Sequence, residues 1–150
     1  MEAEGLATQP SVTFYVVADP SPTAQLSVAC RIVEKAWKAG STVLVQHHDA
    51  AELARLDEML WVGNEQNFIP HEIATTAPSI TTTPVILNGG TGPTAPVDVL
   101  INLTPQLPGR PELAGRIIEI IDTDPARRAA GRERFRAYRE RGFALEKHDL

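Results

Sequence analysis

The sequence predicts an α/β fold with three layers, a mostly parallel sheet and helices on both of its faces. Short runs of β-branched and apolar residues recur along the chain. Segments with the apolar spacing of a helix follow the first two of these runs. A helix that connects two strands of one sheet makes those strands parallel, with a right-handed crossover. At 150 residues and 43% hydrophobic content, the chain is long enough for one well-buried core and too short for two ordinary domains.

Each expected element follows from its own pattern. Strands are expected at residues 12–17, 42–46, 85–87, 98–103 and 117–121, and one short strand is expected between residues 68 and 84. Helices are expected to begin near residues 23, 50 and 125. Thr23 and Asp49 are the expected caps of the first two helices, and Asp122 or Asp124 caps the third. Pro125 suits a first helical turn, where its missing N–H costs nothing.

The chain shows one domain and no sign of a membrane or secretory protein. Residues 1–11 are expected to be a flexible tail, and residues 12–150 a single α/β domain without repeat or linker. No apolar run approaches the 18 residues of a membrane span. The N-terminus is acidic and lacks the basic region and apolar core of a signal peptide. The lone Cys30 excludes an internal disulfide and fits a reducing compartment. We therefore expect a cytoplasmic protein.

The third helix carries an unusual concentration of positive charge. Residues 127–141 hold seven of the eleven arginines and only two acids, so the segment carries about +5 in a chain of net charge -5. One stripe along the helix collects Arg128, Arg132, Phe135 and Arg139, with Arg136 at its edge. Like charges at i,i+4 cost a few tenths of a kcal/mol per pair. Folding alone does not favour such a stripe, so it predicts a binding face for a partner that is both anionic and apolar.

Two other interpretations of this helix remain open. A charged helix face is most often simply solvated, and arginine is a good helix former. A basic stripe with an aromatic residue is also typical of phosphate binding in nucleic acids. The rest of the chain carries about -10 and would repel a long polyanion, whereas a short acidic peptide touching only the stripe avoids that repulsion.

Motifs for nucleotide, metal or nucleophilic chemistry are missing. The glycine cluster at residues 89–92 lacks the Lys-Ser/Thr ending of a phosphate loop, and residues 19–22 after the first strand contain no glycine. His47 and His48 are adjacent on a strand end and no cysteine or glutamate completes a metal site, so a solvated pair is favoured. The sequence therefore disfavours an enzyme, a metal site and a cofactor. A nucleotide-binding α/β enzyme or regulator stays the alternative, because parallel sheets often bind nucleotides at their carboxyl ends.

Three segments together resemble the chi subunit family of bacterial DNA polymerase III holoenzyme. They are residues 13–17 (TFYVV), residues 55–61 (RLDEMLW) continuing to 68–71 (FIPH), and residues 132–139 (RERFRAYR) leading to Gly142 and Phe143. Their order and spacing match the family from roughly residue 12 to residue 145.

This resemblance implies a nucleotide-binding-like α/β fold that binds no nucleotide, and an accessory subunit without intrinsic activity in a DNA polymerase holoenzyme. Chi-like proteins pair with the psi subunit, which ties them to the clamp loader. On another surface they bind the acidic carboxy-terminal tail of single-stranded DNA-binding protein, which ends in Pro-Phe. The resemblance implies neither a membrane partner nor strong direct binding of nucleic acid.

The resemblance also assigns residues to both partners. The basic and aromatic positions that bind the tail match Arg128, Arg132 and Phe135, and Ile121 is expected to complete an apolar pocket. Helical geometry adds two more arginines to this set, Arg136 and Arg139. Phe135 stands where the family has a tyrosine, so the ring is kept and the hydroxyl is lost.

The psi contact carries over to Trp61 and Phe68. Buried aromatic residues are the usual anchors of an interface. The other interpretation of Trp61 is that it closes the second helix against the core.

Overall fold

A computed structural model describes residues 10–62, 69–74, 83–90 and 92–150 of the chain. The elements in chain order are β1 (Ser11–Val16), α1 (Pro22–Lys38), β2 (Val43–Gln46), α2 (Ala50–Val62), β3 (His71–Ala74), β4 (Val85–Asn88), β5 (Val97–Asn102), the 3-10 helix η1 (Pro111–Leu113), β6 (Ala114–Ile121), α3 (Pro125–Glu140) and β7 (Ala144–Asp149).

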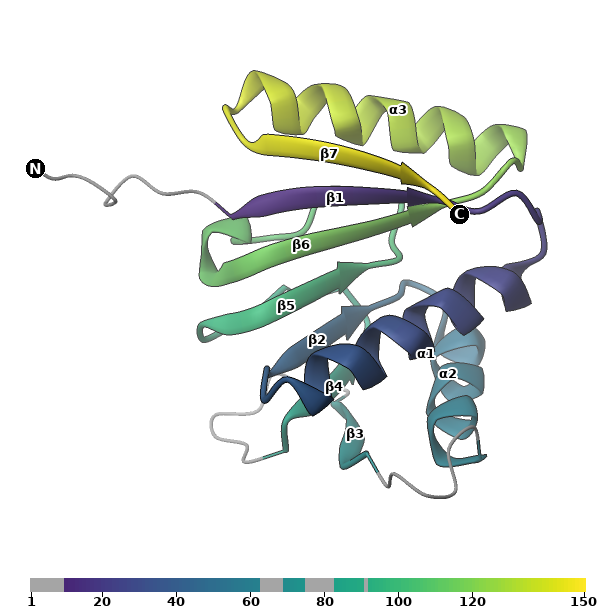
Figure 1. Ribbon diagram of the computed structural model, residues 1–150, viewed down its shortest axis with the longest axis vertical. Coiled ribbons are helices and arrows are strands. Elements are labelled where there is room, and N and C mark those ends of the chain that lie inside the picture. The colour runs from purple at the N-terminus through teal and green to yellow at the C-terminus, as the bar shows by residue number, and fades with distance from the viewer. Residues whose placement is uncertain (1–9, 63–68, 75–82, 91) are drawn as a thin grey trace, which may run out of the picture.

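The strands form one seven-stranded sheet in the order β3-β4-β2-β5-β6-β1-β7 (Figure 1). Every strand pair within the described part of the chain is parallel. This confirms the α/β fold class and the parallel sheet. None of the described helices is long and apolar enough to span a membrane.

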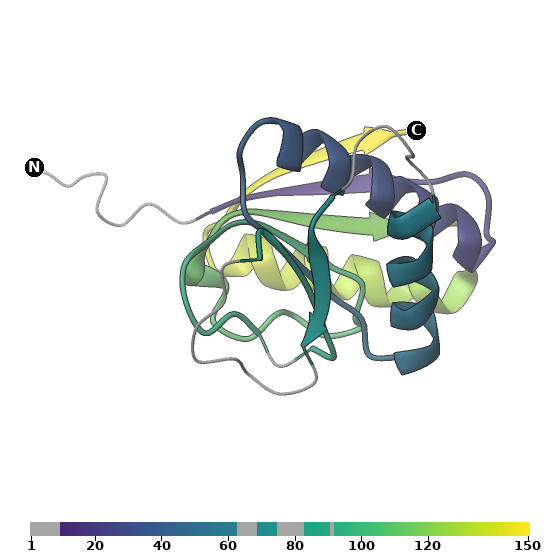
Figure 2. The ribbon, with the colours of Figure 1, turned by 90° about the horizontal axis from the view of Figure 1, so that it is seen from below.

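Helices cover both faces of the sheet, as Figure 2 shows from below. Strand residues alternate between the two faces. Val43 and Val45 belong to the core under α1 and α2. Leu44 between them belongs to the second core, which also contains Phe14 and Tyr138 of α3. The strands are apolar on both faces because both faces are buried, as expected for a parallel sheet.

The helix caps differ from expectation at one place. The N-cap of α1 is Ser21, whose hydroxyl accepts a hydrogen bond from the Thr23 backbone N–H at 3.1 Å. Thr23 was the wrong residue because the proline before it already occupies the first helical turn. The Asp49 carboxylate accepts from the Ala51 N–H at 2.9 Å and so caps α2 as expected. Of the two candidates for α3, Asp124 is the cap.

The sequence pattern did not predict β7, and it predicted a shorter β6 than the structure shows. β7 lies at one edge of the sheet beside β1 and is mostly exposed and charged. Because an edge strand needs few apolar residues, its pattern does not stand out from a loop. β6 begins at Ala114, three residues before the expected start at 117, because Gly115 and Arg116 interrupt the apolar run.

Candidate functional site

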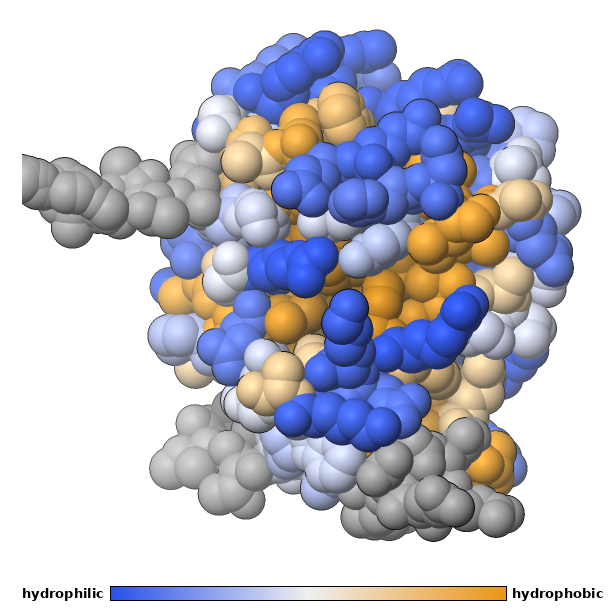
Figure 3. Space-filling model, viewed as in Figure 1, coloured by the Kyte–Doolittle hydropathy of each residue, from blue (hydrophilic) through white to orange (hydrophobic). Residues whose placement is uncertain are grey.

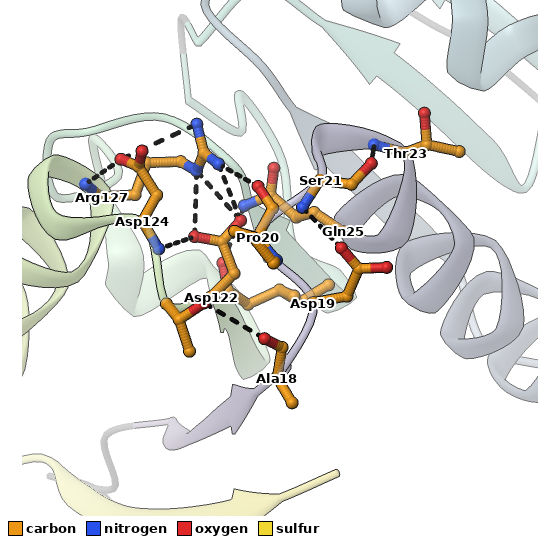
Figure 4. A network of polar contacts seen from close by, with 11 residues as sticks. Ala18, Asp19, Pro20, Ser21, Thr23, Gln25, Asp122, Asp124 and Arg127 are labelled. Carbon is orange, nitrogen blue, oxygen red and sulfur yellow. Dashed lines mark hydrogen bonds and ion pairs between the residues drawn. The ribbon is translucent and has the colours of Figure 1, made fainter.

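The arginines of α3 divide into two groups, and the first group is structural. The Arg127 guanidinium binds both carboxylate oxygens of the buried Asp122, at 2.9 Å from Nη2 and 3.2 Å from Nε. It also donates to the Pro20 carbonyl at 2.7 Å (Figure 4). Arg127 thus ties the start of α3 to the end of β6 and to the loop before α1. The Asp122 carboxylate raises the pKa of the Arg127 guanidinium further above its ordinary value.

The second structural arginine is Arg134, whose side chain lies on the side of α3 that faces the sheet. Its Nε is 2.9 Å from a carboxylate oxygen of Glu119 on β6, and both side chains are buried. Tyr138 and Asn102 donate to the other Glu119 oxygen at 2.7 and 2.9 Å. Burial raises the pKa of the Glu119 carboxyl, while the Arg134 charge and these hydrogen bonds act in the opposite direction. This network fixes α3 on the sheet.

The second group of arginines surrounds a pocket of about 380 Å³ between α3 and the β1/β7 edge of the sheet. Its lining residues are Phe14, Val16, Ile121, Arg128, Gly131, Arg132, Phe135, Arg136, Arg139 and Lys147. All six residues that the sequence analysis assigned to tail binding are in this set. The structure therefore brings the expected site residues together in one pocket. Seen from the α1 side, hydrophilic side chains gather over α3 at the top of the molecule (Figure 3).

The pocket has an apolar floor. The Phe14 and Phe135 rings meet edge to face with centroids 5.2 Å apart. Gly131 lets the helix approach β6 closely, because a Cβ at this position would lie 2.7 Å from Cγ2 of Ile121. Ile121 therefore packs directly against α3 at Gly131. The floor combines aromatic and aliphatic surface that an apolar ligand group could cover.

The rim of the pocket is cationic. Arg136 is paired with Glu133 at 2.8 Å, and the Arg139 guanidinium carbon lies 5.9 Å from the Phe135 ring centroid. Within the described part of the chain, Arg128, Arg132 and Arg139 form no ion pair. Their charges are therefore available to carboxylates of a ligand, which bind guanidinium groups in strong charge-assisted hydrogen bonds.

Four lining residues were not predicted from the sequence: Phe14, Val16, Gly131 and Lys147. Phe14 and Val16 belong to an apolar strand, and nothing in that strand marks the residues next to the pocket. Lys147 lies on β7, which the sequence pattern did not reveal. Gly131 was the one available signal, because a glycine inside an arginine-rich helix costs about 1 kcal/mol and suggests a close approach.

Trp61, one of the two residues expected to bind psi, lies near the opposite edge of the sheet. Trp61, at the end of α2, is 50% exposed, so about half of its surface is not packed against the core. Its ring lies 4.8 Å from the ring of His71 on β3. His71 is held in turn by the Ile69 carbonyl, 2.7 Å from Nδ1. Val62 and Ile73 are also exposed near this edge. Phe68 lies outside the described residues.

The carboxyl ends of the central strands hold a second, much smaller cavity of about 60 Å³, lined in part by His48, Thr104, Arg127 and Arg134. Ligand pockets measure roughly 300–1,000 Å³, so this crevice is several times smaller than a typical ligand site. Both arginines here are already bonded within the protein.

The histidines at the end of β2 do not form the solvated pair that was expected. His47 is buried, and its Nδ1 accepts a hydrogen bond from the Asp49 N–H at 3.0 Å. Burial lowers the pKa of His47. Only His48 is exposed. No group of three or more metal-binding side chains occurs among the residues that the structure describes.

Comparison with known proteins gives one consistent result. The family described as DNA polymerase III chi subunit, HolC, matches residues 10–146. The chain is 41% identical over 139 residues to DNA polymerase III subunit chi of Pseudomonas aeruginosa, covering 93% of this chain and 96% of the relative. It is 27% identical over 139 residues to the same subunit of Escherichia coli, covering 90% and 95%, and 26% identical over 137 residues to that of Haemophilus influenzae, covering 91% and 95%. The chain therefore belongs to the chi subunit family of DNA polymerase III and is a replication accessory subunit.

Proposed function

We propose that this protein is a non-catalytic adaptor with two binding surfaces. The α3 pocket binds the acidic carboxy-terminal tail of single-stranded DNA-binding protein. The surface around Trp61 binds the psi subunit, which links the adaptor to the clamp loader. The bound single-stranded DNA-binding protein is thereby held next to the polymerase assembly.

The observation that carries this proposal is the composition of the pocket. Arg128, Arg132 and Arg139 surround a floor that contains Phe14 and Ile121. A peptide with carboxylates and a terminal Phe supplies both matching parts, since its charges meet the arginines while its ring covers the apolar floor. The pocket volume of about 380 Å³ is near the lower end of the range for ligand sites and suits the end of a chain.

The same composition argues against nucleic acid as the principal ligand. A phosphate backbone would use the arginines but would leave the apolar floor uncovered. The protein also has a net charge of -5, so a long polyanion crossing the molecule would meet repulsion away from α3. A peptide that ends in the pocket avoids that repulsion.

The tail interaction is tested by isothermal titration with a synthetic acidic peptide ending in Pro-Phe. Arg132→Ala should weaken binding by about 1–3 kcal/mol, because it removes a charge-assisted contact. Arg141→Ala is the matched control, since Arg141 follows α3 and does not line the pocket. A peptide that lacks its last two residues should bind much more weakly although its acids remain. Equal binding of the shortened peptide, or displacement of the tail by a low concentration of naked oligonucleotide, would contradict the proposal.

The adaptor is proposed to have no activity of its own. The crevice at the carboxyl ends of the strands is small, and Arg127, which lines it, already donates a hydrogen bond to the Pro20 carbonyl. Equilibrium binding of labelled ATP and NAD separates the adaptor from the nucleotide-binding alternative, because the adaptor should bind neither.

A further inference from the structure

Lys147 lies across the pocket from the arginines of α3. In the β1–β7 pairing Lys147 is in register with Phe14, so both side chains point to the face of the sheet that α3 covers. Lys147 is the one residue of β7 among the lining residues, and it is exposed. No ion pair engages it among the residues that the structure describes. The pocket thus has a cation on its strand side that belongs to a different element from the arginines.

Cations on two sides constrain how an acidic ligand can lie. The arginines of α3 form one wall, the Phe14 and Ile121 side chains form the floor, and Lys147 stands at the other wall. Successive side chains of an extended peptide point in opposite directions. Two consecutive acidic residues in an extended peptide therefore present one carboxylate to each wall. A single acid, or two acids spaced at i and i+2, would reach only one wall.

We propose that Lys147 is a further specificity-determining residue of this pocket. The arginines of α3 bind one carboxylate and the Lys147 ammonium binds its neighbour. This inference rests on the proposed peptide-binding function and adds the wall that β7 supplies.

The test is a double-mutant cycle between protein and peptide. The peptide carries two consecutive aspartates and ends in Pro-Phe, and each aspartate is replaced in turn by asparagine. The proteins are the wild type, Lys147→Gln, Arg132→Gln and the control Lys35→Gln. Lys35 is exposed on α1, so its replacement causes the same change in net charge away from the pocket. Affinities are measured by isothermal titration at low ionic strength, and circular dichroism confirms that each variant is folded.

Lys147→Gln should weaken peptide binding about threefold to tenfold, as expected for a partly exposed charge-assisted contact. In Lys147→Gln, replacing one aspartate of the peptide should no longer change the affinity, whereas replacing the other should weaken binding as it does in the wild type. In Arg132→Gln, the roles of the two aspartates should be exchanged. Lys35→Gln should bind both peptides as the wild type does.

Two results would overturn this inference while leaving the proposed function in place. One is an affinity of Lys147→Gln within twofold of the Lys35→Gln control, and the other is an unchanged sensitivity of Lys147→Gln to both aspartates. If instead Arg132→Gln and Lys147→Gln both bind the peptide as tightly as the wild type, the α3 pocket is not the peptide site and the proposed function itself fails.

Discussion

Phe135 contributes to the pocket through its ring. The ring packs against Phe14 with centroids 5.2 Å apart and lies under Arg139. A phenylalanine has no hydroxyl that could form a hydrogen bond, so we expect its part in the proposed binding to be apolar and aromatic contact. Such contact is not screened by salt, whereas contacts of the arginines are.

Phe135→Ala should therefore weaken binding of the tail peptide by an amount that is nearly the same at low and high ionic strength. The loss caused by Arg132→Ala should shrink as salt is added. Isothermal titration of both variants at two salt concentrations measures the difference. Phe135→Leu serves as a control that keeps apolar volume and should retain part of the affinity. A loss for Phe135→Ala that vanishes at high salt would show that Phe135 acts by positioning Arg139.

At the scale of single residues, helical periodicity predicted much of the pocket. It placed Arg128, Arg132 and Arg139 on one stripe, and all three line the pocket. It could not show that Arg127 and Arg134 are structural, because their partners lie on β6 and are specified by the three-dimensional fold. The local sequence alone does not distinguish a buried arginine from an exposed one.

α3 as an element is held by a buried charge network. Glu119 is fully buried, and Arg134, Tyr138 and Asn102 all bind its carboxylate. Glu119→Gln would leave the Arg134 guanidinium buried without its counter-charge. Removing one partner of a buried ion pair costs about 3–5 kcal/mol, so a large loss of stability is expected.

Urea denaturation at neutral pH measures this loss for Glu119→Gln. Glu133→Gln is the matched control, because Glu133 makes only an exposed pair with Arg136 and should change stability by less than about 1 kcal/mol. A Glu119→Gln variant as stable as that control would mean that the buried network contributes little to holding α3 on the sheet.

The distance between α3 and β6 depends on Gly131. A Cβ at this position would lie 2.7 Å from Cγ2 of Ile121, so Gly131→Ala forces the helix or Ile121 to move. Alanine gains about 1 kcal/mol of helix propensity over glycine, whereas overpacking costs about 1–3 kcal/mol. We expect a small net destabilisation and weaker binding of the tail peptide, because Ile121 lines the pocket.

Combining Gly131→Ala with Ile121→Ala tests whether the contact with Ile121 causes the destabilisation, since the second change removes the clashing methyl group. In thermal denaturation, the stability loss of the double variant should be smaller than the sum of the two single losses. Additive losses would mean that Gly131 does not act through Ile121.

At the scale of elements, short continuous apolar runs predicted the strands that are buried on both faces. Val43 to Val45 in β2 is an example, because every residue there is buried. β7 was missed because Glu146, Lys147 and His148 are exposed at the sheet edge and carry no apolar pattern. The sequence therefore did not predict that β7 lines the pocket, although Lys147 is adjacent to Phe14 in the sheet.

At the scale of the whole molecule, the fold class followed from the sequence and the strand order did not. Placing β1 between β6 and β7 requires contacts between residues far apart in the chain, such as the register of Thr13 with Ile118 and with Glu146. That order sets the distance between the two proposed surfaces. The α3 pocket lies at the β7 edge, whereas Trp61 lies near β3 at the other edge.

Surfaces at opposite edges of one sheet should bind their partners independently. Trp61→Ala should abolish or strongly weaken association with psi, because truncating an interface anchor costs about 2 kcal/mol or more. It should leave the affinity for the tail peptide unchanged, since no residue of α2 or β3 lines the α3 pocket. Arg132→Ala should weaken binding of the tail peptide and leave association with psi unchanged. Size-exclusion chromatography of the protein with psi, with and without saturating tail peptide, measures both.

The wild type should also form a ternary complex with psi and the tail peptide at once. Trp37→Phe is a suitable control for psi, because Trp37 packs against the core under α1 and the replacement retains an aromatic side chain away from the proposed interface. Co-elution of folded Trp61→Ala with psi at normal affinity would remove Trp61 from that interface. Displacement of the tail peptide by psi would mean that the two partners share a surface. Because the two proposed surfaces lie at opposite edges of the sheet, we expect no such displacement and a complex in which the protein binds both partners at once.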